Sequence, residues 1–305
     1  MGDARGTAGE LFTSVVADHV RRIEQRTPAA VADEPDGVHA LRTGVRRLRN
    51  VLAVYRKVFD ADDVAGLRVR LAEFGAVLGD ARDLEVRLAQ VELVGGALAL
   101  DAESEVVRWI ADDLEERYRL AHAQLTGWCL SPAHAELTKL LMHWATDPPL
   151  GPWAQRPAAK TARKRVRRQA DRTVAATDGL DVARLAAPWS ATAAHGLHEA
   201  HEARKAARRL AHATTAVTED PTAVLGEQAQ ALGEQASRLQ KVLGEHRDAL
   251  MLAAYAAELA AGPERDRGPF DAVVDGADQL ARAALADLVP AVAGLQEARD
   301  AFAVS

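Results

Sequence analysis

The chain has 305 residues, a formal net charge of −6, one cysteine (Cys129), 48 % apolar residues and 4 % aromatic residues. This length and composition suffice for one large domain or two ordinary ones with a buried core, and they exclude a disordered or fibrous chain. A single cysteine excludes a disulfide framework and a thiolate metal cluster. Residues 1–10 lack the apolar segment of a signal peptide, and the longest apolar stretch, about 249–257, is too short to span a bilayer. We therefore expect a cytoplasmic protein without a membrane partner.

Apolar residues recur at spacings of three and four in nearly every long stretch, which predicts an all-α fold. In the first half the pattern predicts helices over 8–26, 38–59, 62–94, 101–128 and 132–145. In the second half it predicts helices over 158–176, 190–217, 221–261 and 268–302. Kinks are expected near Gly79 in the first half and near Gly244 and Pro290 in the second. Three prolines within 148–152 interrupt the pattern and divide the chain into a first part of about 8–147 and a second of about 155–300. Amphipathic helices joined by short loops pack as antiparallel bundles.

Two motifs occur twice, in the same order and at nearly the same spacing. The sequence His-x2-Arg-x3-Arg-Arg-Leu of His39–Leu48 recurs at His201–Leu210, and Leu-Gly-x2-Arg-Asp of Leu78–Asp83 recurs at Leu243–Asp248 with Glu-His between the glycine and the arginine. The two parts of the chain therefore form an internal repeat.

Positive charge is concentrated in three segments. Residues 39–57 carry +6, residues 160–172 carry +6 and residues 201–212 carry +3, so the other 261 residues carry −21. An acidic protein with concentrated basic segments suggests a polyanion-binding site on an otherwise repelling surface. The alternative is a set of ordinary solvated helix faces.

A helical wheel groups the basic residues into ladders, each on one face of its helix. The first comprises His39, Arg42, Arg46 and Arg49, with Arg56 beside them. The second comprises His201, Arg204 and Arg208, with Lys205 at its edge and Ala211 at the place equivalent to Arg49. The third comprises Lys160, Arg163, Lys164 and Arg167. The core stripe beside the first ladder comprises Leu41, Val45, Leu48, Leu52, Tyr55 and Phe59.

Neighbouring like charges destabilise a helix, and a bound polyanion would remove that penalty. We expect solvated ladders that contribute little to stability, although pairing with acidic faces of other helices stays open. Arg82 and Arg247 continue apolar stripes, so we expect them to be partly buried, paired and at the edge of the site. We expect Asp83 and Asp248 to orient the arginines of the motifs.

Enzymatic and nucleic-acid alternatives find less support. His195, His198, His201 and Glu202 could group around zinc on one helix, but the first half has no equivalent cluster, so we predict no metal site. Phosphate-transfer, dinucleotide and nucleophile-elbow motifs do not occur, so we predict no catalytic residue and no cofactor. The ladders contain almost no aromatic or amide side chains for bases, which makes nucleic acid an unlikely partner.

The doubled His-x2-Arg-x3-Arg-Arg-Leu and Leu-Gly-x2-Arg-Asp motifs resemble the CHAD family, the conserved-histidine α-helical domains, over about residues 8–300. The resemblance implies two four-helix bundles related by a pseudo-twofold axis. It also implies a basic groove between them that binds inorganic polyphosphate, and association with polyphosphate granules. On this basis the three ladders, together with Arg82 and Arg247, are the predicted polyphosphate-binding residues. An enzyme or regulatory subunit acting on polyphosphate or phosphorylated metabolites, and a binder of nucleic-acid backbones, remain the alternatives.

Overall fold

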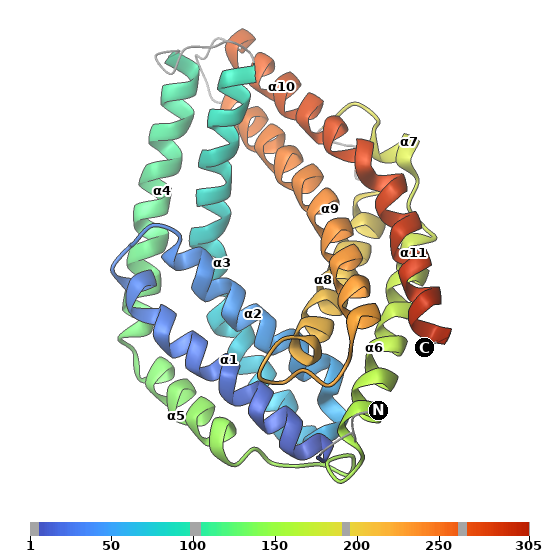
Figure 1. Cartoon of the computed structure of the whole chain (residues 1–305). Helices are drawn as coiled ribbons and strands as arrows, with labels where there is room; N and C mark the ends of the chain where they lie inside the picture. Colours follow the sequence, from blue (N-terminus) through green and yellow to red (C-terminus); the bar gives the residue numbers. More distant parts are fainter. Residues whose placement is uncertain (1–5, 98–104, 191–195, 262–266, 305) are drawn as a thin grey trace.

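The computed structural model describes residues 6–97, 105–190, 196–261 and 267–304 (Figure 1). These ranges contain helices and no strand, so the all-α prediction is confirmed. The elements are α1 (Ala8–Val31), α2 (Gly37–Tyr55), η1 (Arg56–Val58), α3 (Ala61–Ala97), α4 (Glu105–Cys129), α5 (Pro132–Thr146), α6 (Ala158–Thr177), α7 (Val182–Leu185), α8 (Leu197–Thr218), α9 (Glu227–Ala260), α10 (Gly268–Ala284), η2 (Leu285–Asp287) and α11 (Leu288–Val304).

The helices pack in two groups that meet along α2 and α8. In the first group α2 packs against α1 and α3, and α3 packs against α4; in the second α8 packs against α6 and α9, and α9 against α10 and α11. Figure 1 shows α3 and α4 on one side and α9 and α10 on the other, converging at the upper end, where α10 contacts α3. The buried apolar side chains of both groups form one continuous cluster.

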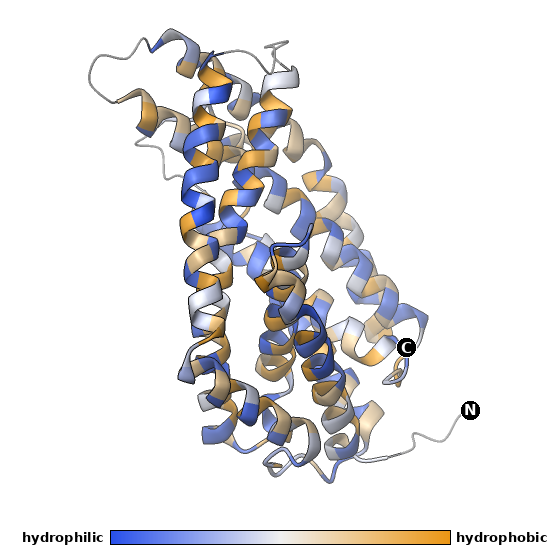
Figure 2. Ribbon diagram, turned by 90° about the vertical axis from the view of Figure 1, so that its left-hand side faces the viewer, coloured by the Kyte–Doolittle hydropathy of each residue, from blue (hydrophilic) through white to orange (hydrophobic). Residues whose placement is uncertain are grey.

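The predicted core stripe of α2 is buried. Its apolar members, together with Phe59, are at most 1 % exposed, and Figure 2 shows the helices of the molecule carrying both polar and apolar residues. Tyr55 lies in this core against Phe12, with ring centroids 4.0 Å apart. Burial of a stripe of this kind supplies most of the stability of a helix in a bundle.

Helix α1 extends five residues beyond its predicted end at about residue 26, and Pro28 lies inside it. A proline costs the helix one hydrogen bond, and contacts with α4 hold the following turn. The His122 ring nitrogen Nε2 lies 2.9 Å from the Ala30 carbonyl oxygen, and the Tyr118 hydroxyl donates to Asp33. Tertiary contacts therefore override the local signal.

Three predicted helices of the second half have different bounds. Helix α8 begins at Leu197, after Gly196 with a φ of +82°, rather than at residue 190; residues 191–195 lie outside the described ranges. The segment 221–226 is not helical, because Pro221 and Gly226 flank it and the amides of residues 224 and 225 donate to the Val217 carbonyl. The predicted helix 268–302 divides at η2, since Pro290 cannot donate to the preceding turn. Helices α3 and α9 run through Gly79 and Gly244.

The segment 147–157 between the two halves is tied to the first half by backbone hydrogen bonds. The Gly151 amide donates to Val58 O at 2.7 Å, and the Gly9 amide donates to Ala154 O at 2.8 Å. A Cβ atom on Gly151 would lie 2.2 Å from the carbonyl oxygen of Phe59, so only glycine fits this approach.

Candidate functional site

Helices α2 and α8 contact each other directly, which brings the first and second ladders to one site. The Tyr55 hydroxyl donates to the Ala213 carbonyl at 2.7 Å, and Asn50 Nδ2 lies 2.9 Å from His212 Nδ1. Both pairs join residues of different halves of the chain. The motif helices therefore face one another across a shared boundary.

Asp83 orients Arg42, as the sequence predicts. Its Oδ1 accepts from Arg42 Nη1 at 2.6 Å, and Gly79 O accepts weakly from the same nitrogen at 3.4 Å. Arg82 lies beside this pair and donates to Glu85 at 2.8 Å, so it is paired and partly buried, as expected. The Arg42 guanidinium therefore has a fixed direction.

The second copy of the motif is arranged differently. Asp248 accepts from its neighbour Arg247 at 3.0 Å, and no hydrogen bond between Asp248 and Arg204 occurs in the described part of the chain. Burial raises the pKa of Asp248, while the charges of Arg247 and Arg204 act in the opposite direction. The Nε atom of Arg204 is buried without a hydrogen-bond partner among the described residues. The two repeats therefore present Arg42 and Arg204 in unequal settings.

Arg46 and Arg208 are the arginines of the site whose pKa values are lowered most. Burial, followed by the charges of Arg42 and Arg204, lowers the pKa of Arg46 to about 10. Burial, followed by the charges of Arg46 and Arg204, lowers the pKa of Arg208 to about 9. Both side chains still carry their charge at neutral pH, and both have a buried Nε atom that no described group satisfies. The expectation of freely solvated ladders is wrong here, because packing of α8 on α2 half-buries them.

Further arginines continue this charge from the α2–α8 boundary to α6. Burial lowers the pKa of Arg49, and the charges of Arg68 and Arg209 add to the effect. Arg68 is in turn affected by Arg56, which also acts on Arg165. We call this set the arginine tract. Its members are Arg82, Arg42, Arg46, Arg247, Arg204, Arg208, Arg209, Arg49, Arg68, Arg56, Arg165, Arg168 and Arg172.

Helix α6 joins the tract through a different face from the predicted one. Arg165 is 6 % exposed, its Nε donates to Val54 O at 2.6 Å, and Arg168 and Arg172 act on its charge. The predicted ladder comprises Lys160, Arg163, Lys164 and Arg167, and two of these side chains lie beside aromatic rings. Lys164 Nζ lies 5.3 Å from the ring centre of Trp153, and the Arg163 guanidinium lies 5.1 Å from that of Phe302. The structure brings the first two ladders together, whereas Lys164 and Arg163 of the third lie beside aromatic rings.

The motif histidines lie at the tract and are neutral at pH 7. Burial lowers the pKa of His39, and the charges of Arg82 and Arg46 add to this. Burial and the charges of Arg204 and Lys205 do the same for His201. Lys205 itself donates to Glu202 at 2.7 Å.

Five arginines of the tract are not among the predicted binding residues: Arg68, Arg165, Arg168, Arg172 and Arg209. Arg209 lies within the repeated motif, and Arg168 and Arg172 lie within the basic segment of 160–172, so the charge count contained their signal. Arg68 lies outside the three basic segments and gave no signal, because its place depends on how α3 packs against α2.

The residues considered for zinc do not come together in the described ranges. His195 lies outside them, and no group of three or more His, Cys, Asp or Glu side chains within them is placed to hold a metal ion. No helix of the described residues is long and apolar enough to cross a membrane.

A family model for the CHAD domain matches residues 14–257. The chain belongs to the CHAD family. Among solved structures, PptA from Streptomyces chartreusis is similar over 97 % of this chain and 100 % of its own, with a TM-score of 0.64 and 20 % identity. The CHAD domain of the plant Ricinus communis is similar over 98 % of this chain and 94 % of its own, again with a TM-score of 0.64 and 20 % identity. At this identity the two structures support the CHAD fold. The comparison with curated proteins found no match.

Proposed function

We propose that this CHAD protein binds inorganic polyphosphate along the arginine tract, without turning it over. The family is linked to polyphosphate-related proteins. The observation that carries the proposal is the set of buried, unpartnered Nε atoms of Arg46, Arg204 and Arg208, contributed by both halves of the chain. An anion would give these donors acceptors and offset the like charges around them, and guanidinium groups hold phosphate oxygens through paired hydrogen bonds.

The shape of the tract favours a long anion over a small one. Its charges run from Arg82 on α3, through the α2–α8 boundary, to Arg172 on α6. A polymer of phosphates engages these groups with one molecule, so each further contact is made at a high effective concentration. A role in targeting the protein to polyphosphate granules, or in organising them, belongs to the same proposal.

The carboxylates of the repeated motif support binding rather than turnover. Asp83 is held by Arg42, and Asp248 is held by Arg247. Each therefore has a positioning partner. Its negative charge is balanced by an arginine and is not directed at a reacting phosphate. Tyr55 directly precedes Arg56 of the tract. Its side chain is fully buried and gives bases no platform to stack on.

The test is a calorimetric titration of long-chain polyphosphate into the wild type and into an Arg46→Gln/Arg208→Gln variant. We expect the variant to bind more than tenfold more weakly, because each charge-assisted hydrogen bond contributes roughly 1.5–3 kcal/mol. The control is Arg21→Gln/Arg119→Gln, which removes the same charge at two exposed positions away from the tract.

Three outcomes would contradict this proposal. Equal losses in the variant and in the control would show that net charge alone drives binding. Release of orthophosphate by the wild type, abolished by His39→Gln or Asp83→Asn, would instead favour an enzyme. Equally tight binding of RNA at the same salt concentration would favour the nucleic-acid alternative.

A further inference from the structure

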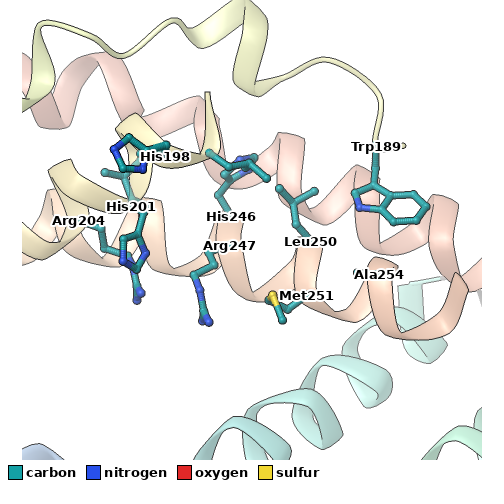
Figure 3. A pocket seen from close by; sticks show the side chains of 12 residues that line it. Trp189, His198, His201, Arg204, His246, Arg247, Leu250, Met251 and Ala254 are labelled. Atoms are coloured by element: carbon teal, nitrogen blue, oxygen red, sulfur yellow. The ribbon is translucent and has the colours of Figure 1, made fainter. Parts of the chain in front are cut away.

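A cavity of about 450 Å³ lies next to the arginine tract, between α8, α9 and the side chain of Trp189 (Figure 3). Most of its wall is apolar. Leu243, Leu250 and Met251 contribute from α9, and Leu197 contributes from α8. Nothing in a purely phosphate-binding site requires such a wall, because a polyphosphate chain has no apolar surface to bury.

Trp189 supplies an aromatic side chain to the same cavity. Its backbone amide donates to Asp278 Oδ1 at 3.1 Å, and Asp278 is itself paired with Arg282 at 2.8 Å. These contacts anchor the residue to α10. A half-buried indole held in this way, together with the flexible thioether of Met251, suits a flat ring system.

Cationic groups border the cavity on one side. Figure 3 shows Arg204 and Arg247 extending in the same direction, whereas His246 and Leu250 point the opposite way. The Nε atom of Arg204 has no hydrogen-bond partner among the described residues. The cavity therefore has an apolar part and a part that favours anions.

His246 adds one unsatisfied acceptor to the apolar part. Its Nδ1 lies 3.1 Å from Ala281 O, and a carbonyl only accepts, so the proton is on Nδ1. Burial lowers the pKa of this histidine, so the ring is neutral and Nε2 carries a free lone pair. No described group donates to Nε2. The atom is buried, so a ligand donor reaches it only when neighbouring side chains move aside.

We propose that this cavity binds a mononucleotide, with the base against Trp189 and Met251 and the phosphates at Arg204 and Arg247. A nucleotide combines a flat ring, N–H donors and a chain of phosphates, which are the three chemistries that the cavity offers to a ligand. The acyl chains of a lipid phosphate carry no donor for His246, and a sugar phosphate has no apolar face of comparable size. The proposal shares two arginines with the polyphosphate site but does not depend on polyphosphate binding.

The test compares ATP with inorganic tripolyphosphate, which carries the same number of phosphates without a nucleoside. Both are titrated calorimetrically, without magnesium, into the wild type and into Ala254→Trp. Ala254 is exposed and lines the cavity, so a tryptophan there fills the space without altering an arginine. The matched control is Ala231→Trp, an exposed alanine on the same helix that does not line the cavity.

We expect the wild type and Ala231→Trp to bind ATP about tenfold more tightly than tripolyphosphate, because stacking of a base adds to the phosphate contacts. In Ala254→Trp this preference should disappear while tripolyphosphate binding stays the same. Equal affinities in the wild type, or a preference that survives in Ala254→Trp, would overturn the proposal. ATP binding without any binding of polyphosphate would leave the nucleotide site standing and refute the proposed function instead.

Discussion

Replacing Arg46 and Arg208 with glutamine should make the unliganded protein more stable, although these residues lie at the centre of the binding site. The pKa values of about 10 and about 9, against 12.5, measure how strongly the fold disfavours each charge. At 1.36 kcal/mol per unit, the shifts correspond to about 3 and about 5 kcal/mol. The repulsion between the two groups is removed only once, and a buried glutamine amide is itself desolvated. We therefore expect a net gain of about 2 kcal/mol in the free energy of unfolding.

The assay is urea unfolding at pH 7 and low salt, followed by circular dichroism, with the Arg21→Gln/Arg119→Gln variant as control. The control loses two exposed ion pairs, each contributing about 0–1 kcal/mol, so its stability should stay level or fall slightly. Added polyphosphate should stabilise the wild type and leave the double variant almost unaffected, since a ligand stabilises only the state that binds it. A double variant less stable than the wild type would refute the reasoning. It would show that Arg46 and Arg208 are satisfied by the protein itself.

Four further predictions concern the extent of the tract, the dependence of binding on salt and pH, and the pH dependence of stability. Arg168→Gln/Arg172→Gln should weaken polyphosphate binding several-fold more than Lys160→Gln/Lys164→Gln, and equal calorimetric losses would return the predicted ladder of α6 to the site. Affinity should fall linearly in a plot of log K against log salt concentration, measured by fluorescence anisotropy, because the bound polymer releases counterions. His39 and His201 have lowered pKa values, so a bound polyanion should favour their protonated forms. Affinity should therefore rise as the pH falls below about 6.5, with proton uptake measurable by calorimetry in two buffers. His212 has a pKa well below 6.5 in the folded state, so the unfolded chain takes up the proton first. Stability should drop as the pH falls below about 6.5, and His212→Gln should flatten that part of the urea-midpoint profile.

The sequence predicted the fold class and most helices because apolar spacing within one helix is a local property. The stripe from Leu41 to Phe59 is buried as its period requires. The sequence also indicated that Asp83 orients an arginine of the repeated motif, and in the structure Asp83 accepts from Arg42. The errors at helix ends occurred where a contact from another helix decides, as at Ala30, which accepts from His122 if that ring nitrogen is protonated.

The extent of the site was less predictable, because it depends on how helices face one another. A helical wheel ranks residues around one axis and cannot show that Arg165, rather than Lys164, faces Val54 on α2. Nor can it show that Arg46 and Arg208 become partly buried when α2 meets α8. The burial that lowers their pKa values depends on how helices distant in the sequence pack together.

The backbone hydrogen bonds of the segment 147–157 bear on how the two halves stay together. Gly151 and Ala154 attach this segment to the first half, while the contact between Tyr55 and Ala213 joins α2 to α8 through space. Cleavage of one backbone peptide bond between Pro157 and Thr161 would leave both sets of contacts in place. The two fragments would then remain associated as a non-covalent heterodimer, with the arginines of both chains still facing one another. In such a split protein, dissociation on dilution would measure directly how much of the cohesion between the halves the bound anion supplies.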